Sequence, residues 1–266
     1  MTEAQMNNFL FGIYPYIALG VGIMGSIARY DRDPFTWKSS SSQLLRRRQL
    51  ILGSILFHVG VLVIFAGHFV GLLTPIRVFD ALGISHSAKQ ILAVAAGGIA
   101  GVMALTGALM LFHRRWTDPR IRGTSSFWDT AILAMLIAQL VLGLLTVLVS
   151  LGHLDGHEMT KFMAWAQGIF TFDSGAAGYI ANAHWLFKAH IVLGLTIILV
   201  FPFTRLVHLI SGIAAPFRYL LARSGYQIVR SRRQQPLAPA PQVVAAARER
   251  VAARAKPAAS RQSPAE

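Results

Sequence analysis

Residues 56–75 read LFHVGVLVIFAGHFVGLLTP. This stretch contains no Asp, Glu, Lys or Arg, and its length matches the ~20 residues that an α-helix needs to cross a bilayer. It also contains His58 and His68. An ionisable side chain at such a depth is costly and usually serves a function. The stretch therefore predicts a transmembrane helix that carries part of a functional site.

Similar apolar blocks recur along the chain. Hydrophobic residues make up 54% of the sequence and charged residues only 14%, whereas a soluble domain carries about 25% charged residues. Each block is expected to be a helix, because backbone polar groups in lipid need internal partners. We therefore predict an all-α integral membrane protein, a five-transmembrane-helix bundle. The predicted spans lie near 8–28, 49–73, 91–113, 128–150 and 184–209.

The basic residues indicate how the bundle is oriented. Segments 29–48 and 114–127 and the tail after residue 209 are rich in Arg, whereas the loops of the opposite side have Arg77, Lys89 and Lys161. By the positive-inside rule, the N-terminus lies outside (periplasmic) and the C-terminus is cytoplasmic. The protein is then a multi-pass protein of the cell inner membrane. This asymmetry explains most of the net charge of +14, so we do not infer nucleic-acid binding.

Composition divides the chain into three parts. Residues 1–209 form the membrane domain. Residues 210–235 are basic with some apolar content and are expected to form an interfacial helix or to dock a partner. Residues 236–266 are rich in Ala, Pro and Arg and contain no aromatic residue, a composition typical of a disordered tail.

Apart from His113 and His184, which are the end residues of their spans, four of the nine histidines lie inside the predicted spans: His58 and His68 in the second, His190 and His208 in the fifth. The chain has no cysteine, which excludes iron–sulfur clusters and thiolate zinc sites. Imidazole is a common axial ligand of haem iron. A single buried histidine is as readily explained by a bond to the backbone. Four histidines at matched ends of two antiparallel helices favour the haem interpretation.

Helix geometry predicts how these four residues pair. His58 and His208 lie toward the cytoplasm, and His68 and His190 lie toward the outside. Antiparallel helices then give two bis-histidine sites, one above the other. The pairs are separated by about 15 Å on the second span and about 27 Å on the fifth, so the helices must tilt or the haems must lie obliquely. Pro202 could kink the fifth helix between its two ligands.

Several other residues admit two interpretations. Gly53, Gly60 and Gly67 form a stripe on the second span, and Gly194 lies one turn from His190. Such glycines either admit a macrocycle or pack membrane helices together. Lys89, on the side of His68, is either a snorkelling lysine or a donor to a quinone carbonyl.

The loop at 153–158 also has two interpretations. It contains His153, Asp155, His157 and Glu158, which are residue types that bind metals. We favour a solvated loop, since nothing in the sequence fixes their geometry.

The chain resembles the gamma subunit of the respiratory nitrate reductase, a cytochrome b membrane anchor. The resemblance covers roughly residues 8–232. It is carried by the spacing F-H-x9-H-F, by H-x17-H and by the segments LFHVGVLVIFAGHFVGLLTP (56–75), AGGIAGVMALTGALMLFHRR (96–115) and HIVLGLTIILVFPFTRLVHL (190–209).

The resemblance implies two b-type haems, an inner one on His58 and His208 and an outer one on His68 and His190. It implies a quinol site at Gly67, His68 and Lys89. Electrons from quinol would pass through the outer and then the inner haem. The implied partners are a cytoplasmic catalytic subunit with a molybdenum cofactor and an iron–sulfur subunit.

Two rival functions remain at this stage. The chain is alternatively the membrane cytochrome b of another quinone-linked oxidoreductase, because the terminal acceptor belongs to a partner. A membrane anchor or transporter without redox function is a rival of another class, but it would not need four paired histidines inside the membrane.

Overall fold

A computed structural model describes residues 1–32, 47–123, 125–210 and 249. The predictions for the basic segment and the tail concern residues outside this set, apart from Ile210 and Glu249. The description below concerns the unit formed by residues 1–212.

Within the described residues, five helices are long and apolar enough to cross a membrane. This confirms the predicted number of spans and the all-helical fold class, while the orientation stays a prediction. The first helix combines α1 (Glu3–Asn8), a π-helical turn η1 (Phe9–Ile13) and α2 (Tyr14–Arg32). The others are α3 (Arg47–Leu73), α5 (His86–Thr117), α7 (Phe127–Ser150) and α10 (Trp185–Val200), which continues into the 3₁₀ turn η3 (Phe201–Phe203).

The starts of α5 and α7 follow from their sequences. The hydroxyl of Ser85 accepts from the backbone N–H of Ala88 at the start of α5. At the start of α7, Ser126 and Asp129 form a reciprocal capping box. Such caps satisfy backbone N–H groups that have no partner inside the helix.

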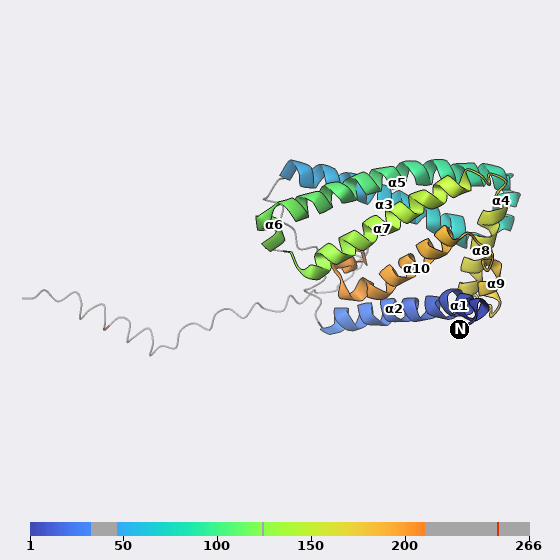
Figure 1. Cartoon of the computed structure of the whole chain (residues 1–266), viewed down its shortest axis with the longest axis horizontal. Helices are drawn as coiled ribbons and strands as arrows, with labels where there is room; N and C mark the ends of the chain where they lie inside the picture. The colour runs from blue at the N-terminus through green and yellow to red at the C-terminus, as the bar shows by residue number, and fades with distance from the viewer. Residues whose placement is uncertain (33–46, 124, 211–248, 250–266) are drawn as a thin grey trace, which may run out of the picture. The chain divides into compact units, whose positions relative to one another are not determined.

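The long helices pack in the order α3, α5, α7, α10 and α2 (Figure 1). α3 packs mainly on α5 and α8, and α10 packs mainly on α7 and α2. α3 and α10, which carry three of the four histidines considered above, are therefore not a packed helix pair.

Glycines explain the close packing of α3 on α5, and they correct one prediction. An added Cβ on Gly60 would lie 2.6 Å from the carbonyl oxygen of Ala100, and one on Gly53 would lie 3.3 Å from that of Gly107. The interpretation of Gly53 and Gly60 as room for a macrocycle is therefore wrong, because both face α5. Gly67 differs, since nothing lies within 4 Å of its added Cβ.

We expect Gly107→Ala to separate α3 from α5. The added Cβ would lie 2.6 Å from the carbonyl oxygen of Gly53 and still closer to the backbone nitrogen of Phe57. Neither backbone atom can move without shifting the helix, so we expect a loss of stability of about 1–3 kcal/mol, the usual range for overpacking. Thermal unfolding of the purified protein in detergent measures this loss.

Gly97→Ala is the matched control for this variant. Gly97 is on the same helix, but nothing lies within 4 Å of its added Cβ. Alanine at an unobstructed helical position stabilises by up to about 1 kcal/mol relative to glycine. Equal unfolding temperatures for the two variants would show that the α3–α5 contact is not as close as described.

Short helices α8 (His157–Phe170) and α9 (Ala176–Tyr179) close one end of the bundle. In Figure 1 they lie with α4 (Ile76–Ala81) at the end opposite to α6 (Pro119–Gly123). The indole N–H of Trp165 donates to the carbonyl oxygen of Phe11 at 2.9 Å, and the hydroxyl of Tyr16 donates to that of Ile169 at 3.0 Å. α8 is 14 residues long and lies in a segment for which the sequence predicts no helix.

Candidate functional site

The structure brings together in two pairs the four histidines that the sequence places in the second and fifth predicted spans, although His208 lies beyond the fifth candidate span, Trp185–Phe203. The ring centroids of His58 and His208 are 6.2 Å apart, and those of His68 and His190 are also 6.2 Å apart. These are the pairs expected from antiparallel helices. Their role as haem ligands stays a prediction.

The distance within each pair fits two imidazoles that share one metal ion. Nitrogen–metal bonds of about 2.0 Å on opposite sides of an ion would place the ring centroids about 6 Å apart. The pairs reach this distance although α3 and α10 are not packed together; His190 lies on α10, and His208 follows η4 beyond the end of α10. His58 and His68 are also exposed in the chain alone, so a flat group can reach both rings.

Three of the rings are oriented by hydrogen bonds between Nδ1 and a backbone carbonyl three or four residues earlier. Such a bond fixes the tautomer and assigns metal coordination to the other ring nitrogen, Nε2. The bonds are His58 to Ser54 (2.7 Å), His68 to Ile64 (2.8 Å) and His208 to Arg205 (2.6 Å).

His190 is held differently. Its Nε2 lies 3.3 Å from the side-chain amide nitrogen of Gln139 on α7. Its Nδ1 is buried and has no hydrogen-bond partner in the part of the chain that the structure describes. A buried polar atom without a partner is uncommon in native proteins and is often explained by a bound group. This atom is one of the observations that fit a haem here.

The sequence predicts a continuous fifth helix to residue 209, and this prediction is wrong. α10 ends at Val200, two 3₁₀ turns follow, η3 and η4 (Arg205–Val207), and Thr204 between them is extended. Pro202 lies at this break, as its lack of an N–H predicts. The kink proposed from the sequence is thus a full interruption. It removes the basis for the 27 Å separation, which assumed a regular helix.

Two charged contacts hold the broken segment that leads to His208. The guanidinium of Arg29 donates from Nη1 to the carbonyl oxygens of Pro202 and Thr204, both at 2.7 Å. Arg205 forms an ion pair with Asp129 at the start of α7, with N and O atoms 3.5 Å apart. The carbonyl oxygens of Pro202 and Thr204 thus have a donor although the helix is interrupted. Together with the ion pair, these bonds hold the segment that precedes His208.

Lys89 is buried and does not snorkel. The residue is only 5% exposed. Its ammonium donates to the carbonyl oxygen of Gly71 at 3.0 Å and to the sulfur of Met163 at 2.8 Å, and it lies 4.0 Å from the centroid of the Phe79 ring. Gly71 belongs to the last turn of α3, whose carbonyls have no partner inside the helix.

Lys89 is also close to the outer histidine pair along α3. Gly71 is three residues after His68 and four after Gly67, which is about one helical turn. The amine therefore reaches α3 within about one turn of both predicted quinol residues. The open space around Gly67 lies on the same turn.

The remaining histidines contribute no comparable cluster. Among the described residues, no group of three or more His, Cys, Asp or Glu side chains could hold a metal ion. The prediction of a loop through residue 158 is wrong at its end, because His157 and Glu158 are the first two residues of α8. Glu158 instead forms an ion pair with Lys161 at 2.6 Å, and His86 bonds Asp80 at 3.2 Å.

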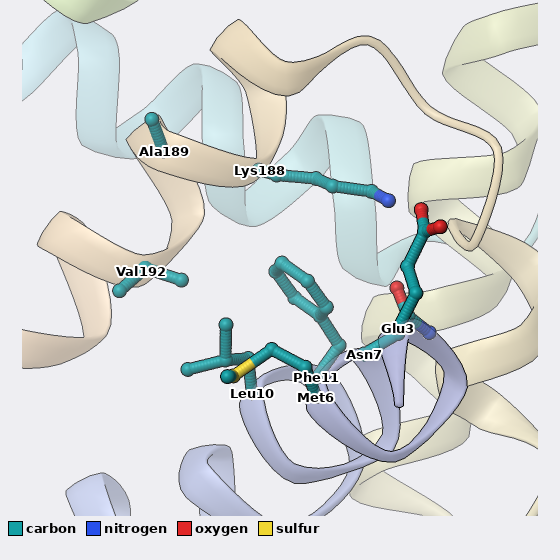
Figure 2. Close-up of a pocket in the computed structure, with 8 residues that line it drawn as sticks. All are labelled: Glu3, Met6, Asn7, Leu10, Phe11, Lys188, Ala189 and Val192. Atoms are coloured by element: carbon teal, nitrogen blue, oxygen red, sulfur yellow. The ribbon is translucent and has the colours of Figure 1, made fainter. Parts of the chain in front are cut away.

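Figure 2 shows a cavity between the N-terminal helix and α10. Its volume is about 300 Å³, and its lining includes Leu10, Phe11, Lys188 and Val192. None of its lining residues is a predicted haem or quinol residue, so the cavity lies beside the candidate site and not within it.

Gln139 is the residue of this site that sequence reasoning missed. It is an amide in the middle of an apolar span, at residue 139 of α7. A polar side chain at that depth is a signal in itself. An amide is not ionisable, so the rule that identifies charged groups inside a span does not identify Gln139.

Comparisons with known proteins agree with this arrangement. The family model described as "Nitrate reductase gamma subunit" matches residues 7–232. The chain is 45% identical to the "Respiratory nitrate reductase 1 gamma chain" of Escherichia coli (strain K12), over 85% of this chain and 98% of that protein. It is 39% identical to the "Nitrate reductase gamma chain" of Bacillus subtilis (strain 168), over 84% and 97%.

A more distant similarity connects to another complex. The chain is 28% identical to the "Hdr-like menaquinol oxidoreductase cytochrome b-like subunit" of Archaeoglobus profundus, over 64% of this chain and 50% of that protein.

Proposed function

Because the chain belongs to the nitrate reductase gamma subunit family, we propose that it is the membrane cytochrome b subunit of a quinol–nitrate oxidoreductase in the inner membrane. The observation that carries this proposal is the pairing of four histidine rings, each pair 6.2 Å apart, with His58 and His68 on α3, His190 on α10 and His208 on the broken segment after α10. Family membership and the five apolar helices support it independently.

Two b-type haems would be held by these pairs. His58 and His208 hold the inner one, and His68 and His190 hold the outer one. Bound haem supplies one-electron redox chemistry. The chain's own contribution is to fix the imidazoles, through the backbone bonds to Nδ1 and the contact with Gln139.

The orientation of the bundle is part of the proposal. Arginines of α2, α3, α5 and α6 gather at one end of the bundle, which by the positive-inside rule faces the cytoplasm. The arginines are Arg29, Arg32, Arg48, Arg114, Arg115, Arg120 and Arg122. His58 and His208 lie toward this end, where a cytoplasmic iron–sulfur subunit and the molybdenum-cofactor subunit would bind.

Quinol would bind at the opposite end, beside Gly67, His68 and Lys89. Nothing lies within 4 Å of a Cβ added to Gly67, so no neighbouring atom of the chain blocks a ring there. The Lys89 ammonium would donate to a quinol oxygen after giving up one of its present bonds, to Gly71 or Met163. Protons released there would leave on the outer side.

A second candidate is the cytochrome b of another quinone-linked complex. The similarity to the archaeal menaquinol oxidoreductase subunit supports it. In this second candidate function the chain would use the same histidine pairs and the same quinol site, and only its soluble partners would differ.

Purification of the intact complex from membranes tests both candidates. We expect a reduced-minus-oxidised spectrum with b-type bands, two haems per chain, and copurifying subunits that reduce nitrate with a quinol analogue. Absence of any b-type band would overturn the cytochrome assignment. Two haems with partners inactive on nitrate would instead favour the second candidate.

A further inference from the structure

Gln139 of α7 lies against the imidazole of His190 on α10. The amide N–H donates to the carbonyl oxygen of His190 at 3.1 Å, and the same nitrogen lies 3.3 Å from the ring nitrogen Nε2. One side chain from a neighbouring helix thus contacts both the backbone and the ring of this histidine. Each of the other three rings is instead bonded through Nδ1 to a carbonyl of its own helix segment.

Two glycines make room for this contact in a reciprocal way. Gly143 lies one turn after Gln139, and a Cβ there would lie 3.1 Å from Cε1 of His190. Gly194 lies one turn after His190, and a Cβ there would lie 3.1 Å from Nε2 of Gln139. Each helix therefore has a glycine where the other presents its polar side chain. This corrects the interpretation of Gly194, which faces Gln139 and not a macrocycle.

The contact contains two unpaired polar atoms. Oε1 of Gln139 and Nδ1 of His190 are both buried and have no hydrogen-bond partner among the described residues. Leaving such an atom unpaired costs about 1–3 kcal/mol. An imidazole bound to a metal through one nitrogen carries a proton on the other and needs an acceptor for it. A half-turn of the amide would exchange its oxygen and nitrogen. Oε1 would then accept from an N–H at Nε2 of His190, Nδ1 would be the nitrogen left to coordinate, and the amide bond to the carbonyl oxygen of His190 would be given up.

We propose that Gln139 is a positioning residue for the outer haem, acting through His190. Its amide oxygen would accept from the N–H at Nε2 of the imidazole when Nδ1 is coordinated, and this bond would fix the rotation of the ring. This rests on the proposed function, specifically on His190 being a haem ligand. An acceptor on the ring N–H makes the coordinating nitrogen more basic, which favours ferric iron. Removing it should raise the reduction potential of the outer haem.

The test compares Gln139→Leu and Gln139→Glu with the wild type in the intact complex. Potentiometric titration should show two b-type components in each, with only one component displaced. Loss of a residue that hydrogen-bonds to a metal ligand typically changes metal affinity or activity 10–100-fold. We expect at least about a tenfold higher ratio of reduced to oxidised outer haem in Gln139→Leu, which is about 59 mV for one electron. Gln139→Glu, an anionic acceptor, should shift the same component the other way.

Gln49→Leu is the matched control. Gln49 also donates to a backbone carbonyl of a neighbouring helix, that of Met110 at 3.3 Å, but it touches none of the four histidines in the contacts described. It should leave both potentials unchanged. Electron paramagnetic resonance of the ferric haems supplies a second readout, since the signal of the displaced component should change only in the Gln139 variants.

The outcomes separate this inference from the proposed function. If Gln139→Leu loses the outer haem but Gln139→Glu keeps it at a lowered potential, the inference stands. Loss of the haem in both variants, shifts in one common direction, or potentials equal to those of Gln49→Leu would overturn it. Absence of two b-type components in the wild-type complex would instead overturn the proposed function.

Discussion

His68→Ala and His190→Ala are expected to remove the same b-type component, and His58→Ala and His208→Ala are expected to remove the other. Each alanine deletes one of two imidazoles whose centroids are 6.2 Å apart. The remaining ring cannot complete the pair. Quinol-driven nitrate reduction should fall by more than about 100-fold. Replacing a residue that only hydrogen-bonds to a metal ligand already lowers activity by up to about 100-fold. Potentiometric titration of each purified complex identifies the component that is lost.

His113→Ala serves as the control for these four variants. His113 lies near the end of α5 and is exposed, so its removal should leave both components in place. A result in which His68→Ala and His190→Ala remove different components would contradict the pairing. Retention of full nitrate reduction by His58→Ala or His208→Ala would show that the inner pair is not needed for electron transfer.

Periodic and bulk features of the sequence predicted the spans and the histidine pairs well. An apolar block of about 20 residues has few alternatives to a membrane helix. Once helices two and five are antiparallel, the ends at which their histidines lie follow from order along the chain. The pairing of His58 with His208 and of His68 with His190 therefore required no side-chain detail.

Features that depend on a neighbouring helix could not be predicted in this way. Gly53, Gly60 and Gly67 share a stripe in the sequence, but only packing on α5 decides that the first two are covered and the third is open. The break after Val200 depends on Arg29, from a helix far away in the chain, to bond the freed carbonyls. The contact between Gln139 and His190 likewise depends on how α7 packs against α10.

The burial of Lys89 changes how its role must be tested. Its amine caps the end of α3 through Gly71 and contacts Met163 on α8. Lys89→Ala would therefore leave a cavity and remove a helix cap as well as a quinol donor. Lys89→Met keeps most of the side-chain volume and removes only the ammonium, so it separates binding from packing more cleanly.

We expect Lys89→Met to lower kcat/KM for quinol oxidation by about one to two orders of magnitude. A hydrogen bond from a charged donor contributes about 1.5–3 kcal/mol, and 1.4 kcal/mol is a factor of ten. Both haem components should remain, because Lys89 is not a ligand. Lys89→Arg should recover part of the activity, since its charge is kept but its donors lie in a fixed plane. Stopped-flow oxidation of a quinol analogue, with a haem spectrum of each sample, measures both properties.

Lys188→Met is the matched control, because the Lys188 amine also donates to a backbone carbonyl, that of Ala181 at 2.6 Å. It removes a comparable cation–carbonyl bond on α10, away from Gly71 and the end of α3. If Lys89→Met and Lys188→Met oxidise quinol equally fast, the role of Lys89 is structural, through its hydrogen bonds to Gly71 of α3 and Met163 of α8. The quinol donor would then have to be another group near His68. If Lys89→Met alone is slow while its unfolding temperature matches that of Lys188→Met, the lost rate belongs to quinol binding and not to the helix cap.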